Sequence, residues 1–491
     1  MGMPRPFPPA LGAAVSTAMA PVRSPDLSVV RAAVAGLSAP GSAVPAVLAA
    51  ALGLAALGLT ACGRSSQGPE IKILWAEWRP SDALAELGRE YQAETGVRVQ
   101  VVKKSWDGAF GDAVFAEFRN RDDHYDIIVG DSQWLGLGAV GGHYVELTDW
   151  IPANLPVDRI EPAALKWYSE YPKGSARYYA VPCEADAVAW AYRKDLFEDP
   201  GHKSAFAAFL AREKAEPFPL APPATWDQLR LIARYFKQAV PGMAGLVMPT
   251  SRRYDMATMG FEPVLWSFGG DFGDYATSKV TIASPATVEA LRFHADLLSA
   301  GAPGGRNMGY GEVMAEYIAG RAAMACNFMA FFPSFTSPGD NPDFYDKTGF
   351  FNSPGQKGAD GTFRRAVALG GQGMSVNAHI APERQARAKD FLKWFSASGV
   401  QGRWAAKGGF TADKSVLAGE GFRKAAPYNP LFEEAFQLMR DFWAVPEYDE
   451  MMKSCQREFC AVFQDGADPE AAARRVQEEH EAILAKRGRA R

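Results

Sequence analysis

The sequence predicts an α/β fold built on a doubly wound parallel sheet, because strand-like and helix-like segments alternate between residues 71 and 131. Three extended apolar segments are separated by two segments whose apolar residues recur at helical spacing. Such an alternation gives parallel strands joined by right-handed helical crossovers. In these sheets ligands bind beyond the carboxyl ends of the strands, so a site is expected among the residues that follow each strand.

Each of the five segments is identified by its own pattern. The first strand, residues 71–75, is the extended apolar run Ile-Lys-Ile-Leu-Trp. A helix is expected over 81–95, where apolar residues at helical spacing precede a glycine: Leu84, Leu87, Tyr91 and Gly96. Residues 97–102 alternate as a half-buried strand, and a second helix is expected at about 106–119. The third strand, 125–131, is an apolar run that ends in a glycine and an acid.

The N-terminal region indicates export from the cytoplasm. An apolar run rich in small residues, 43–59, leads into the tetrapeptide Leu59-Thr60-Ala61-Cys62. The run is short for a membrane span and is typical of a signal-peptide core that ends at a cleavage site. We predict a bacterial lipoprotein signal over 1–61, with Cys62 as the lipidated first residue and 62–69 as a flexible tether. The alternative is an ordinary secretory signal with an incidental cysteine, and both place the rest of the chain outside the cytoplasm.

Composition argues against several classes of function. With 48% hydrophobic and 22% charged residues, the 491-residue chain has the composition of a globular protein of two or three domains. Its net charge is −4 and its basic residues form no long runs, so no nucleic-acid surface is expected. The scattered six histidines and the lack of a Cys-x-x-Cys motif argue against zinc, and no metal or cofactor is expected.

Four cysteines follow Cys62 in the sequence. They allow three pairings, and the sequence does not choose among them: Cys183, Cys326, Cys455 and Cys460. The last two lie five residues apart on an expected helix and point in different directions, so a disulfide between them is not expected.

A formal match to the dinucleotide-binding fingerprint Gly-x-Gly-x-x-Gly occurs at 136–141. The true motif begins at the end of the first strand and has an acid at the end of a second strand about twenty residues later. This match follows the third strand, and residues 158–162 show no strand pattern. We interpret the glycines as small residues that pack a helix against the sheet.

Residues 178–197 resemble the crossover segment of family 1 extracellular solute-binding proteins, the sugar-binding components of ABC importers. The segment reads Tyr-Tyr-Ala-Val-Pro-Cys-Glu-Ala-Asp and continues to Tyr-Arg-Lys-Asp-Leu-Phe. The resemblance continues in order along the chain, at 223–229, 265–271, 284–291, 320–324, 370–377, 388–395 and 466–472. Two departures are Arg193, where the family often has asparagine, and an aromatic, Pro-rich insert at 328–354.

The resemblance implies a two-lobed fold of the type II periplasmic-binding-protein kind, with each lobe a doubly wound sheet. One lobe would comprise 69–182 and 370–425, and the other 187–366 and 430–488, with two or three crossing strands as the hinge and a cleft between the lobes. It further implies a monomeric, non-enzymatic binding protein that delivers a carbohydrate, expected to be an oligosaccharide or glycoside, to an ABC permease.

Sugars present hydroxyl edges and apolar faces, so their sites combine aromatic rings with acids and amides. Candidates of these types follow the expected strands or lie at the crossovers. They are Trp75, Glu77, Trp78, Asp131, Trp134, Glu184, Asp186, Trp266, Asn327, Gly371 and Gln372. The ordinary alternative for the tryptophans is core packing, and for the acids a helix cap or a solvated surface. Trp190 and Trp394 are assigned to the core.

Three other functions stay open. The solute could be a polyamine, an organophosphate or a metal complex, although the abundant aromatics argue against iron. The protein could instead be a ligand sensor for a membrane receptor. It could also be a secreted glycoside-active enzyme that uses Asp131 and Glu184 as its carboxylate pair. No Gly-x-Ser-x-Gly elbow, His-Glu-x-x-His motif or phosphate loop supports an enzyme.

Overall fold

The computed structural model describes residues 68–490 except 107, 276, 303–304 and 442. From Gly68 onward the chain forms one compact unit. The predicted signal peptide, Cys62 and most of the predicted tether lie outside the described residues. In the part that the structure describes, no helix combines the length and the apolar character needed to cross a membrane.

The first three strands form the predicted parallel sheet. Strand β1 (Glu70–Ala76) lies between β2 (Arg98–Lys104) and β3 (Ile127–Asp131) and pairs in parallel with both. Helices α2 (Arg79–Thr95) and α3 (Ala109–Asn120) connect them. The predicted boundaries are correct to within about three residues, because apolar periodicity and breaking glycines mark both helices and strands.

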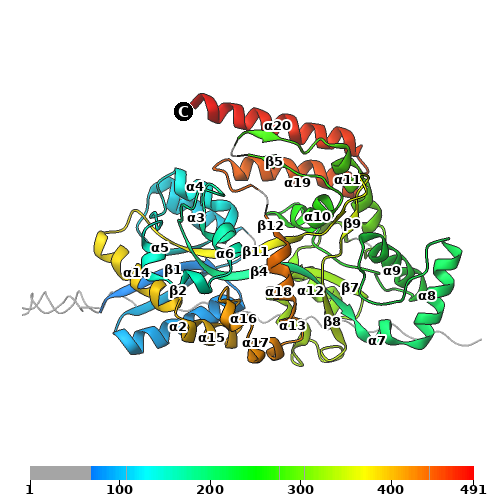
Figure 1. The fold of residues 1–491 in the computed structure, drawn as a ribbon, viewed down its shortest axis with the longest axis horizontal. Coiled ribbons are helices and arrows are strands. Elements are labelled where there is room, and N and C mark those ends of the chain that lie inside the picture. Colours follow the sequence, from blue (N-terminus) through cyan, green and yellow to red (C-terminus); the bar gives the residue numbers. More distant parts are fainter. Residues whose placement is uncertain (1–67, 107, 276, 303–304, 442, 491) are drawn as a thin grey trace, which may run out of the picture. The chain divides into compact units, whose positions relative to one another are not determined.

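Two long strands connect this sheet to a second set of strands. Strand β11 (Val367–Val376) pairs antiparallel with β3, and β4 (Val181–Arg193) pairs antiparallel with β11. Further along, β4 pairs with β7 (Met324–Phe328) and β8 (Thr348–Asn352). Figure 1 shows β4 and β11 between β1 and β2 on one side and β7 and β8 on the other. The chain therefore has the two-lobed α/β architecture that the resemblance implied.

The change of partners within β4 locates the passage from one lobe to the other. Ala187 pairs with Leu369 of β11, whereas the next residue, Val188, pairs with Phe328 of β7. Short strand β12 (Met439–Arg440) pairs in parallel with the first two residues of β11. The complete lobe boundaries given above stay predictions.

Helices surround both sets of strands, and two small hairpins lie outside the main sheet (Figure 1). Helices that contact the first set or its helices include α14 (Pro382–Phe395) and α15 (Ser398–Ala406). The remaining helices are α4 (Leu135–Val140), α5 (Trp150–Asn154), α6 (Pro162–Ala164), α7 (Lys194–Glu198), α8 (Pro200–Arg212), α9 (Trp226–Ala239), α10 (Met256–Ser267), α11 (Pro285–Leu298), α12 (Tyr310–Ile318), α13 (Phe332–Thr336), α16 (Lys414–Leu417), α17 (Glu420–Ala425), α18 (Leu431–Leu438), α19 (Tyr448–Asp465) and α20 (Pro469–Ala490). The hairpins pair β5 (Gly273–Asp274) with β6 (Lys279–Val280), and β9 (Gln356–Lys357) with β10 (Phe363–Arg364).

Both tryptophans assigned to the core contact it, but they are buried to different extents. Trp190 of β4 is fully buried and its ring stacks on Phe351 at 6.0 Å between centroids. Trp394 is only half-buried, and its indole N–H donates to a carboxylate oxygen of Glu94 at 2.7 Å. Its ring packs against two core residues, Tyr91 of α2 and Phe391 of α14, so Trp394 lies at the edge of the core.

The other structural expectations concern the cysteines and the glycine-rich segment. All four described cysteines are buried and unpaired, and Cys455 and Cys460 lie on α19.

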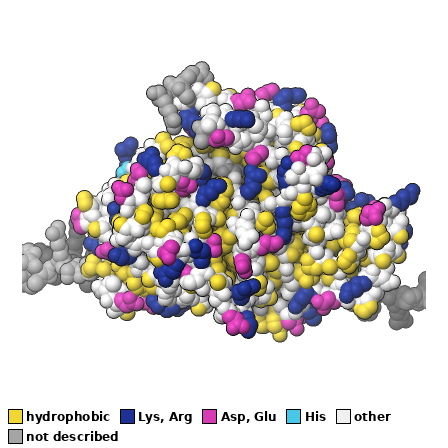
Figure 2. Space-filling model, in the orientation of Figure 1, with side chains coloured by type: hydrophobic (Ala, Val, Ile, Leu, Met, Phe, Trp, Pro, Cys, Tyr) yellow, Lys and Arg dark blue, Asp and Glu magenta, His cyan; other side chains and the backbone are white. Residues whose placement is uncertain are grey.

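The segment 136–141 lies largely in α4, where a Cβ on Gly136 would come within 1.8 Å of the Ala444 carbonyl oxygen. The glycine thus permits close packing, as expected, but its neighbour is the loop before α19 and not the sheet. Figure 2 shows acidic and basic side chains interspersed over the visible face.

Candidate functional site

A pocket of about 480 Å³, part of it open to solvent, lies where the two sets of strands meet. Its walls come from both lobes and from the two crossing strands. The lining residues are Trp78, Trp106, Asp131, Ser132, Gln133, Asp186, Tyr254, Asp255, Met259, Tyr310, Phe328, Phe331, Leu369, Gly370, Gly371 and Gln372.

The first lobe contributes residues that follow its parallel strands. Trp78 comes two residues after β1, Trp106 two residues after β2, and Asp131 is the last residue of β3. Ser132 and Gln133 follow Asp131 directly. Because the carboxyl ends of parallel strands meet at one edge of a sheet, these five side chains gather at the position where α/β sheets bind ligands.

The second lobe contributes aromatic residues near helix starts and after a strand. Tyr254 and Asp255 directly precede α10, and Tyr310 begins α12. Phe328 ends β7, and Phe331 follows three residues later. The insert flagged in the sequence, 328–354, therefore supplies two rings to the pocket.

Aromatic rings of the two lobes touch each other around the pocket. The centroids of Trp78 and Phe331 are 6.4 Å apart, and those of Trp106 and Tyr254 are 6.3 Å apart. Within the second lobe, Tyr310 stacks on Phe331 at 5.7 Å. Such ring pairs are favourable beyond their buried area, so they stabilise the lobes in this closed arrangement.

Three carboxyl groups line the pocket and are held by neutral donors. Asp131 accepts a hydrogen bond from the side-chain amide of Gln372, its partner across β3 and β11. Asp255 accepts from the Tyr310 hydroxyl at 2.9 Å. Asp186 accepts from the backbone N–H groups of Ala187 at 2.7 Å and of Ala330 at 3.3 Å. These bonds fix the positions of the carboxyls in both lobes and in the hinge.

Burial changes the protonation of this cluster. It raises the pKa of Asp186 to about 7, although hydrogen bonds from backbone N–H groups act to lower this pKa. It also raises the pKa of Asp255 to about 7, although the hydrogen bond from the Tyr310 hydroxyl acts to lower it. Burial also raises the pKa of Asp131 and of Glu184 well above the usual carboxyl range, and neighbouring carboxyls add to both increases. A low-dielectric environment disfavours the charged form, which is the cause in all four cases.

We expect the stability of the ligand-free protein to fall as pH rises from about 4 to about 7. A carboxyl whose pKa is raised on folding binds its proton more tightly in the folded chain, and this stabilisation is lost as pH rises through the folded pKa. Asp186 and Asp255 each contribute at most about 1.4 kcal/mol per pH unit over this interval. Thermal unfolding across pH measures the effect, and Asp255→Asn should flatten the profile. A melting temperature that rises steadily over this range in the wild-type chain contradicts the prediction.

Five of the eleven predicted site residues line the pocket: Trp78, Asp131, Asp186, Gly371 and Gln372. Gly371 has a φ of 89°, and a Cβ there would lie 2.1 Å from the Glu184 carbonyl oxygen. Its role is thus the close approach of β11 to β4. Gln372 connects the pocket to the core, because its amide donates to Asp131 and accepts from the indole N–H of Trp75.

The other six predicted residues do not line this pocket. Trp75 is fully buried beneath it and packs on Trp404, while Glu184 is fully buried within β4. Asn327 donates to the Tyr310 carbonyl oxygen at 3.0 Å, so it anchors the start of α12. The remaining three are an exposed acid and two buried rings: Glu77, Trp134 and Trp266.

Comparison with known families decides which class of protein carries this pocket. A model of the bacterial extracellular solute-binding protein family matches residues 76–402, about two thirds of the chain. The chain belongs to this family.

Individual relatives of this solute-binding protein are distant. A probable amino-acid ABC transporter periplasmic-binding protein of Sinorhizobium fredii is 23% identical over 435 residues, which cover 87% of this chain and 91% of the relative. A probable ABC transporter-binding protein of Deinococcus radiodurans is 26% identical over 316 residues, covering 62% of this chain and 66% of the relative.

Solved structures share the fold of this solute-binding protein. An ABC transporter solute-binding protein of Agrobacterium radiobacter in complex with ribitol and maltose-bound MalE3 of T. maritima each give a TM-score of 0.71 at 23% identity. Both comparisons cover 85% of this chain, with 99% and 100% of the two structures. A solute-binding protein of Agrobacterium vitis with bound D-mannitol gives 0.67 at 18% identity, covering 86% and 99%. These likenesses establish the two-lobed fold.

Several lining residues of the solute-binding protein were missed by sequence reasoning. Trp106 follows β2 just as Trp78 follows β1, so the strand-end rule applied equally to it. Tyr254, Asp255 and Tyr310 follow irregular segments without a periodic pattern, and only the tertiary structure brings them to the pocket.

A second hollow lies on the other side of the Trp106–Tyr254 ring pair. Both rings line it together with Phe110, Trp134 and residues of α19. Trp134, a predicted site residue, thus lines this neighbouring hollow.

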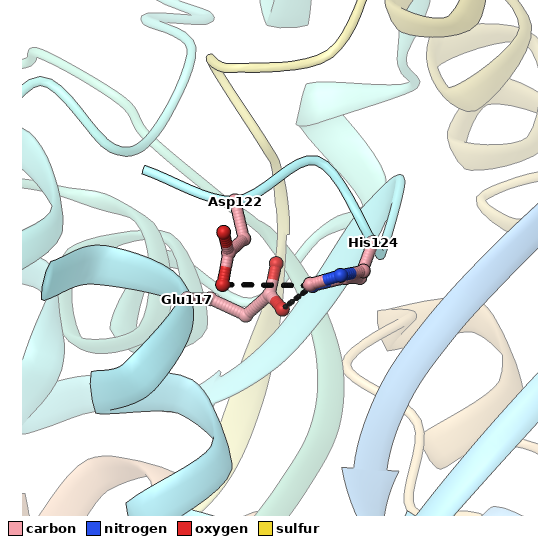
Figure 3. A group of neighbouring side chains, drawn as sticks. All are labelled: Glu117, Asp122 and His124. Carbon is pink, nitrogen blue, oxygen red and sulfur yellow. Dashed lines mark hydrogen bonds and ion pairs between the residues drawn. The ribbon is translucent and has the colours of Figure 1, made fainter. Parts of the chain in front are cut away.

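A cluster of titratable side chains lies at the end of α3. His124 Nδ1 is 2.8 Å from Glu117 Oε1 and 3.6 Å from Asp122 Oδ2. Figure 3 shows the three side chains grouped together. Hydrogen bonding to Glu117 raises the pKa of His124, which is largely exposed. None of the three residues lines the pocket, and the ion pairs account for their grouping.

Proposed function

We propose that this protein is the lipid-anchored, extracytoplasmic solute-binding component of an ABC importer, and that it captures a carbohydrate or polyol between its lobes. The proposal includes delivery to a permease and action as a monomer without enzymatic activity. Membership of the solute-binding family supports it, as do the two relatives, which are named as probable ABC transporter binding proteins.

One observation carries the choice of a hydroxylated solute. Among the lining residues, four buried polar atoms have no hydrogen-bond partner in the protein: Trp78 Nε1, Trp106 Nε1, Asp131 Oδ2 and Tyr254 Oη. Unsatisfied buried polar groups are costly, so a bound ligand is expected to pair with them. Sugar and polyol hydroxyls both donate and accept, and the aromatic walls suit their apolar faces. The ribitol, maltose and mannitol complexes of the structural neighbours agree with this class.

Lobe closure would couple binding to transport. The pocket takes Trp78 and Trp106 from one lobe and Tyr254 and Phe331 from the other, so a solute in it contacts both. Such a solute binds the closed form more tightly than the open form and shifts the population toward closure, as in periplasmic binding proteins generally. The permease would then recognise the closed form.

The glycoside-active alternative is disfavoured by the position of its carboxylate pair. Asp131 lines the pocket, but Glu184 is fully buried behind it and is not among the lining residues. Glycoside hydrolysis requires two carboxyls that flank the scissile bond. The pair named from the sequence therefore does not have the arrangement that the chemistry needs.

A thermal-shift screen of the full-length chain tests the proposed function. The probes are ribitol, mannitol, maltose and maltotetraose, with glycerol 3-phosphate and an iron complex as non-sugar comparisons. A solute at one hundred times its Kd stabilises the protein by about 2.7 kcal/mol, which should raise Tm by about 3 °C for a chain of this size. The proposal predicts a carbohydrate or polyol hit that is not consumed on incubation. Hits only among the non-sugar probes would contradict the solute class, and consumption of the sugar would indicate an enzyme.

Replacing the proposed lipidated cysteine should release the protein from the membrane. Cys62→Ser removes the thiol to which the lipid would be attached, and stable anchoring needs buried acyl chains. Fractionation of the producing bacterium should find the wild-type chain with the membrane and the variant in the soluble extracytoplasmic fraction. Equal membrane association of both would show that Cys62 carries no anchor. Solute affinity should be the same in both.

A further inference from the structure

The charges around the pocket are of one sign. The lining residues include three carboxyl groups, Asp131, Asp186 and Asp255, and no lysine, arginine or histidine. Two further carboxyls, Glu184 of β4 and Glu262 of α10, are fully buried, and none of their four oxygens has a hydrogen-bond partner in the protein. Coulombic interactions link these acids, since Asp131 and Asp186 act on Glu184, and Asp255 acts on Glu262.

Three arginines near the pocket lining are paired with acids outside it. Arg440 is paired with Asp271 at 2.7 Å and lies over the Trp266 ring, outside the pocket lining. Arg252 and Arg253, which precede Tyr254 in the chain, pair respectively with Asp465 at 2.6 Å and with Glu312 at 3.6 Å. The donors that reach the three lining acids are amides, a hydroxyl and backbone N–H groups. Buried carboxylates without a cationic partner are costly, and a positive charge on the ligand would compensate them.

The aromatic side chains fit the same charge. Six rings line the pocket, from Trp78, Trp106, Tyr254, Tyr310, Phe328 and Phe331. The faces of such rings attract cations as well as the apolar faces of sugars, and the attraction strengthens when the cation is desolvated. Rings combined with carboxylates are therefore suited to an organic cation.

A bare metal ion fits less well. Among the described residues, Glu117, Asp122 and His124 are the group of side chains close enough together to share a metal ion. This group lies outside the pocket. The pocket carboxyls are spread over both lobes and the hinge, so they match a cation carried on an extended frame. An amino acid would bring a carboxylate into a pocket whose lining holds no basic side chain, although one relative is named for amino acids.

We propose that the solute carries a protonated amine on a hydroxylated frame, and that one of the three lining acids, Asp131, Asp186 or Asp255, binds the ammonium group while the aromatic rings hold the frame. The inference rests on the proposed function and narrows its substrate class. The hydroxyls pair with the indole N–H groups and the Tyr254 hydroxyl, as above. The amine supplies the positive charge that the protein itself does not place in the pocket.

Calorimetric titration of the full-length chain with matched solute pairs at pH 7.5 tests this inference. Glucamine carries an amine where sorbitol carries a hydroxyl. Glucosamine has a basic amine that can be charged, whereas the amide nitrogen of N-acetylglucosamine is neutral. The inference predicts that at least one amine-bearing partner binds ten or more times tighter than its neutral counterpart. Spermidine is the probe for an amine without a hydroxylated frame.

Variants show whether the acids cause the preference. At least one of Asp131→Asn, Asp186→Asn and Asp255→Asn should reduce the amine-to-neutral affinity ratio at least threefold, whereas Asp158→Asn, at an exposed site, should leave it unchanged. Neutral partners that bind as tightly as the amines in the wild-type chain would overturn the inference and leave the proposed function intact. Binding of neither member of any pair would count against the proposed carbohydrate class as well. Spermidine binding tighter than all hydroxylated amines would overturn the hydroxylated frame.

Proton exchange provides a second readout. A bound ammonium favours the carboxylate form, so binding should release protons from Asp186 and Asp255, whose pKa is about 7 in the empty pocket. The ionisable groups that face these two acids are other carboxyls and neutral phenols: Asp131, Glu184, Glu262, Asp441, Tyr168, Tyr310, Tyr428 and Tyr448. Affinity for the amine should rise by up to tenfold per pH unit between pH 6 and 7 for each proton released. An affinity that is flat or falls over this range would contradict the inference.

Discussion

Replacing Trp78 by alanine is expected to weaken solute binding about 30- to 100-fold. The ring lines the pocket, touches Trp106 at 5.2 Å and meets Phe331 of the other lobe at 6.4 Å. Its buried indole N–H has no partner in the protein, so the variant removes a stacking face, a donor and a contact that closes the lobes. Central aromatic residues of this kind typically contribute about 2–3 kcal/mol to binding.

The control for this variant is Trp167→Ala. Trp167 is also half-buried, but it lies outside the pocket lining, beside Lys166 and Lys173. Titration calorimetry should find wild-type affinity in this control and weakened affinity in the Trp78 variant. Comparable affinities in the two variants would mean that Trp78 does not contact the solute.

The second large effect is expected in stability, from Gly371→Ala. Gly371 has a φ of 89°, which side chains rarely adopt, and a Cβ would lie 2.1 Å from the Glu184 oxygen and 2.8 Å from the Asp186 nitrogen. Both atoms are backbone atoms of β4, so relief requires moving one crossing strand away from the other. The combined strain and overlap should cost about 3–4 kcal/mol and lower Tm by about 4 °C.

A helical glycine provides the matched control. Gly402 lies in α15, and an added Cβ meets nothing within 4 Å. Gly402→Ala should therefore keep or raise Tm, since alanine favours a helix by up to about 1 kcal/mol over glycine. If Gly371→Ala unfolds at the wild-type temperature, the close contact between the crossing strands does not constrain the hinge.

The first lobe was predictable because its signals are local. Apolar periodicity and Gly96 define the strands and helices, and the rule that ligands bind at carboxyl ends of parallel strands led to Trp78 and Asp131. The same rule could not separate Trp78 from Trp75. The latter is still within β1, where its side chain enters the core, whereas the former lies beyond the strand.

The second lobe was less predictable because its pocket residues come from helix starts after irregular segments. Sequence reasoning chose Trp266, which lies near the C-terminal end of α10, while the pocket contacts the N-terminal end through Asp255 and Met259. Eleven residues separate Asp255 from Trp266, about 16 Å along a helix. The direction in which α10 approaches the cleft follows from packing against α11 and α19, which local patterns do not reveal.

The central claim is that the pocket between the lobes holds the solute, and a crystal structure of the full-length chain with its tightest solute tests this most directly. We expect electron density for the solute between Trp78 and Tyr310, within hydrogen-bonding distance of Asp131 or Asp255. Solute density in another hollow, such as the one lined by Trp167 and Arg440, with none between the aromatic walls, would contradict it.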